Sequence, residues 1–74
     1  MNDIYKKTEN LVKAKGYTPT QAWKIGMGVT VCEIKSNDPY NSLLRVNTRT
    51  GEVANLFPTI QQIKDIQSIQ AYQY

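Results

Sequence analysis

The 74-residue sequence has no histidine and one cysteine, and both scarcities exclude classes of site. Without histidine, proton-transfer catalysis near neutral pH lacks its commonest general acid and base. One thiol cannot build a zinc site or an internal disulfide. Cys32, which lies in an apolar run beside Val31, is therefore predicted to be a small buried hydrophobe. We expect no metal and no cofactor.

The six acidic residues are few and scattered, which argues against a catalytic pair. Glu33 and Glu52 could meet across a sheet, but paired carboxylates serve catalysis only where burial separates their pKa values. The segment Gly26-Met27-Gly28 is too short for a dinucleotide-binding fingerprint and is interpreted as a helix terminator. The sequence therefore predicts that the protein is not an enzyme.

Long apolar runs are also missing, and the charge is only mildly positive. No stretch reaches the roughly 18 apolar residues of a membrane-spanning helix, and the first residues lack the apolar part of a secretory signal. We expect a soluble cytoplasmic protein with no membrane partner. Nine Lys or Arg against six Asp or Glu give a net charge of +3, spread along the chain. Such a spread favours solubility over nucleic-acid binding.

The length predicts one small domain, 1–74, with a thin margin of stability. A chain this short buries only about 60 % of the surface that its unfolded form exposes. Without disulfides or a metal, association with a partner is the remaining common source of stability. A second copy of the chain or another protein is therefore the expected partner, and a well-packed monomer is the alternative.

Two helices are predicted before the first strand. Residues from Asp3 to Lys15 place apolar side chains on one helical face, and Gly16 can end the helix. The run Thr18-Pro19-Thr20-Gln21 has the pattern of a capping box with proline at the first helical position. A short helix is therefore expected from Pro19 to about Gly26.

The middle of the chain predicts three strands. The β-branched run from Val29 to Lys35 is the first, and residues 43–47 and 53–57 form a hairpin. Gly51 supplies the positive φ that the hairpin loop needs, and the loop places Arg49 at its tip. Arg45 alternates with apolar neighbours, so it is expected on the exposed face of the sheet.

A last helix is predicted after Pro58-Thr59, with isoleucine at every third position from Ile60. A period of three slips by about 60° per step around a helix, so one sheet cannot cover the whole series. Two interpretations stay open: the isoleucines form a second contact surface, or the helix ends near Gln67 and residues 67–74 form a loose tail.

The expected fold is therefore α+β, with two N-terminal helices, a three-stranded antiparallel sheet and a C-terminal helix. The helices are expected to cover one face of the sheet and to leave the other exposed. The turn Thr50-Gly51-Glu52-Val53 resembles the last strand pair of small PepSY-type domains, which are mostly extracytoplasmic. Only these four residues match closely, and Asn47 stands where such turns frequently have Asp. The sequence is assigned to no family on this basis.

The expected function is binding without catalysis. We expect a small regulatory or inhibitory accessory protein, acting by protein–protein contact as an oligomer, of the kind that phages and mobile elements encode. The residues expected to bind the partner are apolar anchors after Pro58 and arginines of the hairpin, since both types are enriched at interface hot spots. They are Arg45, Arg49, Ile66, Ile69 and Tyr72.

The alternative function is nucleic-acid binding. Ala22 and Gly26, four residues apart after a capped start, resemble the first helix and turn of a helix-turn-helix unit. The hairpin with Arg45 and Arg49 would then be a wing that contacts phosphates. The segment from Val29 to Lys35 would have to be the recognition helix, although its β-branched residues favour a strand and only Lys35 is basic.

Overall fold

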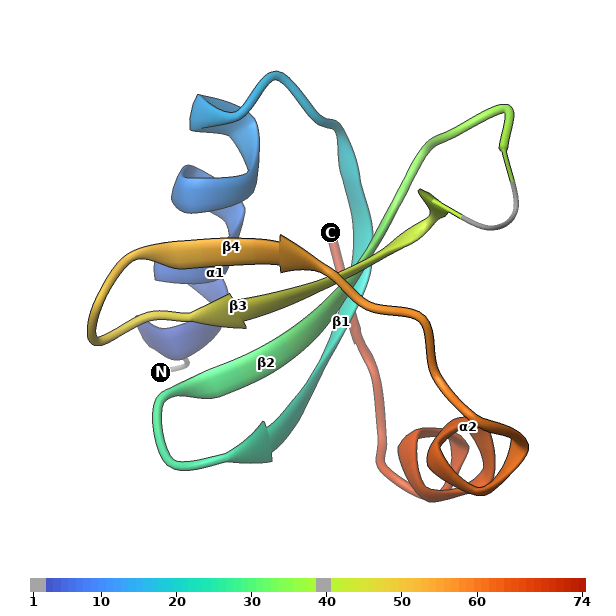
Figure 1. The fold of residues 1–74 in the computed structure, drawn as a ribbon. Coiled ribbons are helices and arrows are strands. Elements are labelled where there is room, and N and C mark those ends of the chain that lie inside the picture. The colour runs from blue at the N-terminus through green and yellow to red at the C-terminus, as the bar shows by residue number, and fades with distance from the viewer. Residues whose placement is uncertain (1–2, 39–40) are drawn as a thin grey trace.

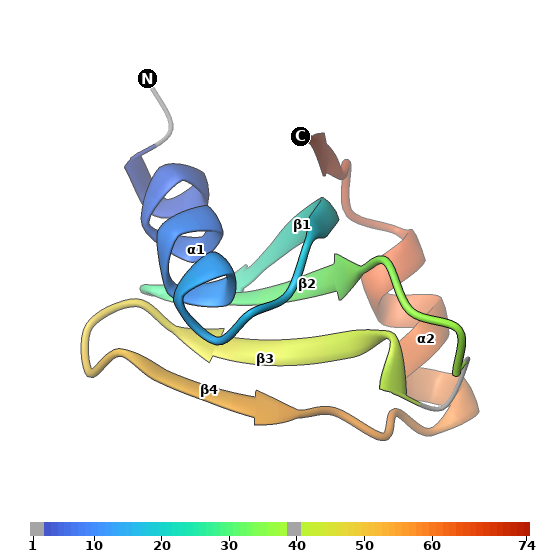
Figure 2. The same ribbon diagram turned by 90° about the horizontal axis from the view of Figure 1, so that it is seen from above.

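The computed structural model describes residues 3–38 and 41–74 of the chain, which form two helices and a five-stranded sheet. Figures 1 and 2 show the arrangement from two directions. The elements in chain order are α1 (Asp3–Ala14), β1 (Pro19–Gly26), β2 (Val29–Ile34), β3 (Leu43–Asn47), β4 (Glu52–Asn55), α2 (Ile60–Gln67) and β5 (Tyr72–Gln73).

The sheet is antiparallel throughout, with the strand order β4-β3-β2-β1-β5. Strands β1 to β4 follow one another as neighbours, as expected when short turns connect antiparallel strands. The chain then leaves the sheet to form α2 and returns to add β5 on the outer side of β1 (Figure 1). The first and the last strand of the chain, β1 and β5, are therefore neighbours in the sheet.

The α+β class is correct, but the expected three-stranded sheet preceded by two helices is wrong. Residues Pro19–Gly26, predicted to be the second helix, are strand β1. The backbone of this segment is paired with distant strands: the Lys35 N–H donates to the Thr18 carbonyl at 2.8 Å. The Thr20 hydroxyl donates to the Glu33 carbonyl at 3.1 Å instead of capping a helix. Tertiary pairing therefore overrides a local capping pattern.

The helix predicted after Pro58 is present as α2, but it is not the last element of the chain. Thr59 caps it with a reciprocal capping box: its hydroxyl accepts the Gln62 N–H at 3.2 Å, and the Gln62 side chain accepts the Thr59 N–H at 2.8 Å. The helix ends at Gln67, and the chain continues into β5. The prediction of a C-terminal helix is therefore corrected to a helix followed by a fifth strand.

The β3–β4 hairpin confirms the role predicted for Gly51. Gly51 has φ +81°, in the region that glycine adopts without strain, and its N–H donates to the Asn47 carbonyl at 2.8 Å. The Asn47 side chain accepts the N–H groups of Arg49 and Thr50 at 3.0 and 3.2 Å, which fixes the loop. Strand β4 covers Glu52–Asn55 and so begins and ends earlier than predicted.

The core lies between α1 and one face of the sheet. Alternate residues of the three central strands point to this face and are almost completely buried. A buried hydrogen bond between the hydroxyls of Thr8 and Thr30, at 2.8 Å, joins the helix to β2. The Thr8 hydroxyl also donates to the Ile4 carbonyl at 2.7 Å, so Thr30 is the donor of the pair. The core residues are Val12, Ala22, Cys32, Ile34, Leu44 and Val46.

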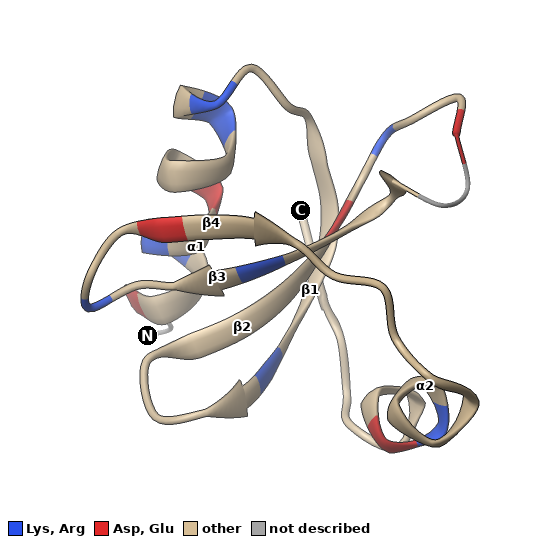
Figure 3. Cartoon of the chain, viewed as in Figure 1, with Lys and Arg blue, Asp and Glu red and all other residues tan. Residues whose placement is uncertain are grey.

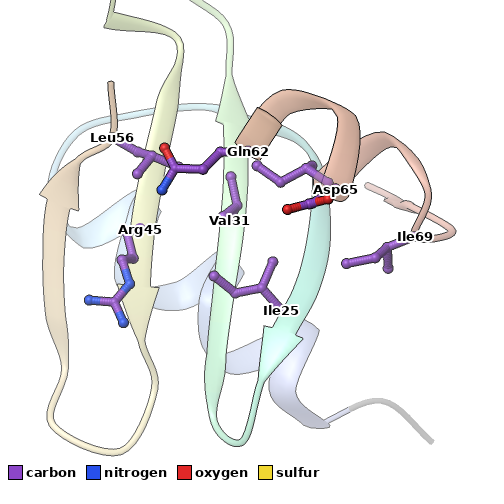
Figure 4. Close-up of a pocket in the computed structure, with 8 residues that line it drawn as sticks. Ile25, Val31, Arg45, Leu56, Gln62, Asp65 and Ile69 are labelled. Atoms are coloured by element: carbon purple, nitrogen blue, oxygen red, sulfur yellow. The ribbon is translucent and has the colours of Figure 1, made fainter. Parts of the chain in front are cut away.

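The two helices lie on opposite faces of the sheet. Helix α1 covers the core face, and α2 lies against the other face, near one end of the strands (Figures 2 and 4). The expectation that all helices cover one face is therefore wrong. The path of the chain gives the reason. After the outer strand β4, the chain must cross the sheet to reach the far edge, where β5 pairs with β1. Because α1 already covers the core face, the crossing that contains α2 runs over the other face.

Three tyrosines fix β5 to α1. The rings of Tyr5 and Tyr72 stack with centroids 4.7 Å apart, and Tyr74 packs edge-on against Tyr72 at 5.2 Å. The Tyr74 hydroxyl donates to the Tyr5 carbonyl at 2.8 Å. Tyr72 and Gln73, within the segment left open as a loose tail, are therefore held by α1 as well as by β1. Neither helix described in the structure is long and apolar enough to cross a membrane.

Candidate functional site

An open groove of about 550 Å³ lies on the sheet face opposite α1, between the sheet and α2 (Figure 4). Its lining is mainly apolar, with one cationic and one anionic side chain. The lining residues are Ile25, Val31, Arg45, Leu56, Gln62, Asp65, Ile66 and Ile69.

The register of the strands determines which side chains form the floor and one wall of the groove. Val31 on β2 is paired with Arg45 on β3 and with Trp23 on β1, and Arg45 is paired in turn with Ala54 on β4. Directly opposed residues share a face, so these side chains form one row across the groove face. Val31 has no exposed surface, whereas the side chain of Arg45 is exposed.

One face of helix α2 forms the opposite wall of the groove. Ile66 packs on the sheet and is 8 % exposed. Successive residues of a helix are rotated by about 100° around its axis. Gln62 and Asp65 are therefore displaced from Ile66 toward the groove, by at most about 100°, whereas Ile63 and Ile60 are displaced in the opposite direction. Ile66 and Ile69 therefore line the groove, whereas Ile60 and Ile63 lie outside it, and Ile60 is 75 % exposed.

The groove has a charge of each sign on opposite walls. The salt bridges between described residues join Glu9 to Lys6 and Lys13 on α1, and Arg45 has no ionic partner in residues 3–38 and 41–74. Asp65 on α2 accepts a hydrogen bond from the Gln61 side chain at 3.0 Å.

Three of the five residues predicted to bind a partner line this groove: Arg45, Ile66 and Ile69. The other two lie elsewhere. The side chain of Arg49 packs over the β1–β2 turn, where a Cβ on Gly28 would be 2.8 Å from Arg49 Cγ. Tyr72 belongs to the tyrosine cluster on the α1 side.

The remaining groove residues were not predicted from the sequence. Ile25 lies in the segment predicted to be the second helix, and Asp65 is one of the six scattered acidic residues. A signal did exist for Val31: once residues 29–34 and 43–47 are read as paired strands, their alternate residues must share a face. No local signal shows that α2 lies on that same face.

The chemistry available elsewhere in the described chain is limited. Cys32 is fully buried, as predicted. Burial raises the pKa of its thiol to about 12, and the negative charge of Glu33 adds to this effect. A thiol that stays protonated is a poor nucleophile and a poor metal ligand. In residues 3–38 and 41–74, no three His, Cys, Asp or Glu residues gather as metal ligands.

The helix-turn-helix interpretation loses its basis in the structure. Both of its expected helices are strands, β1 (Pro19–Gly26) and β2 (Val29–Ile34). Lys and Arg lie on or beside α1, on β1, β3 and α2, in the hairpin loop and just after β2, in separate parts of the fold (Figure 3). A phosphate backbone is usually bound by a clustered basic surface.

Comparison with protein-family models, with curated proteins and with solved structures gave no match to this chain. The resemblance of Thr50-Gly51-Glu52-Val53 to PepSY-type turns therefore receives no support from a family match. What the protein does is inferred below from its groove.

Proposed function

We propose that the protein is a non-enzymatic regulator or inhibitor that acts by protein–protein contact through the groove face. The observation that carries the proposal is the combination of an apolar groove with an arginine that has no ionic partner in the described chain. Arginine beside a desolvated apolar pocket is a common hot spot of protein interfaces.

The shape of the groove supports a protein as the ligand. Sites for small molecules bury most of the ligand surface, commonly 70–90 % of it. This groove has a floor and two walls but lies open along the sheet (Figure 4). A partner protein supplies its own surface as the missing cover, so its side chains can fill the groove and remain shielded from water. The buried, protonated Cys32 thiol also supports a role in binding without catalysis.

A site-specific cross-linking experiment tests this proposal. A photo-reactive amino acid is placed at Leu56 in the groove, and in a matched variant at Lys13 on the outer surface of α1. Irradiation of intact cells should give protein adducts from position 56 and few from position 13, and mass spectrometry identifies the attached chain. If position 56 gives no protein adduct, or if both positions give the same adducts, the groove is not the binding surface.

We also propose that the protein works in the cytoplasm. The support is its single cysteine, since disulfide-dependent small domains are typical of oxidising compartments. Fractionation of the source cells, followed by immunodetection, checks this location. Recovery in a secreted or membrane fraction would contradict it.

A further inference from the structure

We infer that a second copy of this chain covers the groove face, so that the protein is a two-fold symmetric dimer. The inference rests on the proposed function, because it assigns an identity to the protein that the groove binds. It is carried by the arrangement of the elements around the groove and by the signs of the charges on its walls.

The arrangement of the elements on the groove face leaves room for a second copy. Helix α2 lies over β2 and β1 on this face, while β3 and β4 carry no helix there among the described residues (Figure 4). A two-fold axis in the plane of the interface, running along the groove, places the helix of each copy over the uncovered strands of the other. Both copies then use the same surface, with the helix of each on the half of the face that the other copy's own helix leaves open, as an isologous interface requires.

The charges obey the same symmetry. Arg45 stands on the β3 wall, and Asp65 stands on the α2 wall. Rotation about the proposed axis exchanges the walls, so Arg45 of each copy faces Asp65 of the other. Two equivalent cross-pairs then flank an apolar centre formed by Ile25, Leu56 and Ile69, which line the groove and keep exposed surface.

Charge exchange tests the dimer through its proposed contact. Sedimentation velocity on the purified chain, from about 1 µM to 1 mM, should show a monomer–dimer equilibrium. R45E and D65K should each weaken dimerisation by roughly tenfold or more, since both symmetric contacts become repulsive. The double variant R45E/D65K restores opposite charges and should return to within about threefold of the original Kd. Circular dichroism verifies that each variant is folded.

Ile60→Ser is the matched control. Ile60 is 75 % exposed and lies on the side of α2 away from the groove, so this substitution should leave dimerisation unchanged. Loss of the dimer in I60S together with retention in R45E would place the interface on the wrong side of α2. A monomer at every concentration, or a double variant no better than the single ones, would also overturn the inference.

The outcomes separate this inference from the proposed function. If the chain is monomeric but position 56 cross-links to another protein, the dimer is wrong and binding through the groove stands. If position 56 cross-links only to a second copy and the charge exchange restores association, the dimer is supported. If the chain is monomeric and position 56 gives no adduct, both proposals fail.

Discussion

The two faces of the sheet differ in how completely the chain covers them. On one face, α1 packs against alternate residues of β1, β2 and β3, and no buried side-chain polar atom described there or elsewhere in residues 3–38 and 41–74 lacks a hydrogen-bond partner. On the other face, α2 covers part of the strands and leaves a groove of about 550 Å³ beside an exposed arginine. Most of the buried side chains thus lie on the α1 face, and the proposed binding surface is the other face.

Adjacent leucines of β3 give the largest expected contrast. Leu44 points to the α1 face and is 1 % exposed, whereas Leu43 points to the groove face and is only partly buried. Leu44→Ala should lower the free energy of unfolding by about 2–5 kcal/mol, because it leaves a cavity in the core. Leu43→Ala should cost about 1 kcal/mol or less. Urea denaturation at one fixed protein concentration measures both, and equal losses would show that the two faces are equally packed.

The buried threonine pair gives the next largest effect. Thr8→Val leaves the buried Thr30 hydroxyl without its acceptor, so it should cost about 1–3 kcal/mol of unfolding free energy. Replacing both threonines by valine removes both polar groups and should cost less than the sum of the single changes. Thermal denaturation of the three variants checks this, and strictly additive losses would mean that the two hydroxyls act independently.

Alkaline pH tests how well the α1 face excludes water. Burial raises the pKa of Cys32 from 9.0 to about 12. The protonated thiol therefore contributes its full share to the free energy of unfolding below about pH 9, and this share is lost as the pH rises toward 12. The loss is at most about 1.4 kcal/mol per pH unit, and partial burial of Tyr74, which raises its phenol pKa, acts in the same direction.

Cys32→Ala should therefore lower stability at neutral pH but flatten the decline above pH 9. Urea denaturation at pH 8, 9, 10 and 10.5 compares the two proteins. Parallel pH curves would mean that the thiol ionises equally well in the folded and unfolded chains. As an independent check, a thiol reagent should label native Cys32 slowly and the unfolded chain rapidly.

The capping box of α2 gives the smallest expected effect, about 0.5–2 kcal/mol for Thr59→Ala. Because α2 is packed on one side only, we expect hydrogen exchange to speed up in α2 before it changes in α1. Thr18→Ala is the control, since Thr18 begins a capping pattern in the sequence but precedes a strand in the structure. Faster exchange spread evenly over both helices would show that α2 does not open separately.

What could be predicted from the sequence was local. The amphipathic spacing from Asp3 gave α1 to within one residue at its end, and the need for a positive φ at Gly51 located the β3–β4 hairpin. Both signals act over a few neighbouring residues. The pattern Thr18-Pro19-Thr20-Gln21 was local too, but pairing with β2 on one side and β5 on the other determines that segment as β1.

The parts that escaped prediction depend on distant pairings. Strand β5 has two residues, too few for a periodic signal, and its partners on β1 are about fifty positions earlier in the chain. The groove has the same origin. Arg45 and Ile66 were each expected at a partner surface, but only the crossing of the chain to the second face brings them to one site. That crossing follows from the whole topology, which no single segment reveals.

The late pairing of β5 has a consequence for the order of folding. The β1–β2 and β3–β4 turns join residues that are close in the chain, so these hairpins need little loop closure. The contact between Gln21 and Gln73 spans 52 positions, and the contact between Tyr5 and Tyr74 spans 69, so both close long loops. We therefore expect β5 and its tyrosine stack to form last and to detach first. Detachment would expose the unpaired N–H and C=O groups at the outer edge of β1, where a strand of another chain could pair with them.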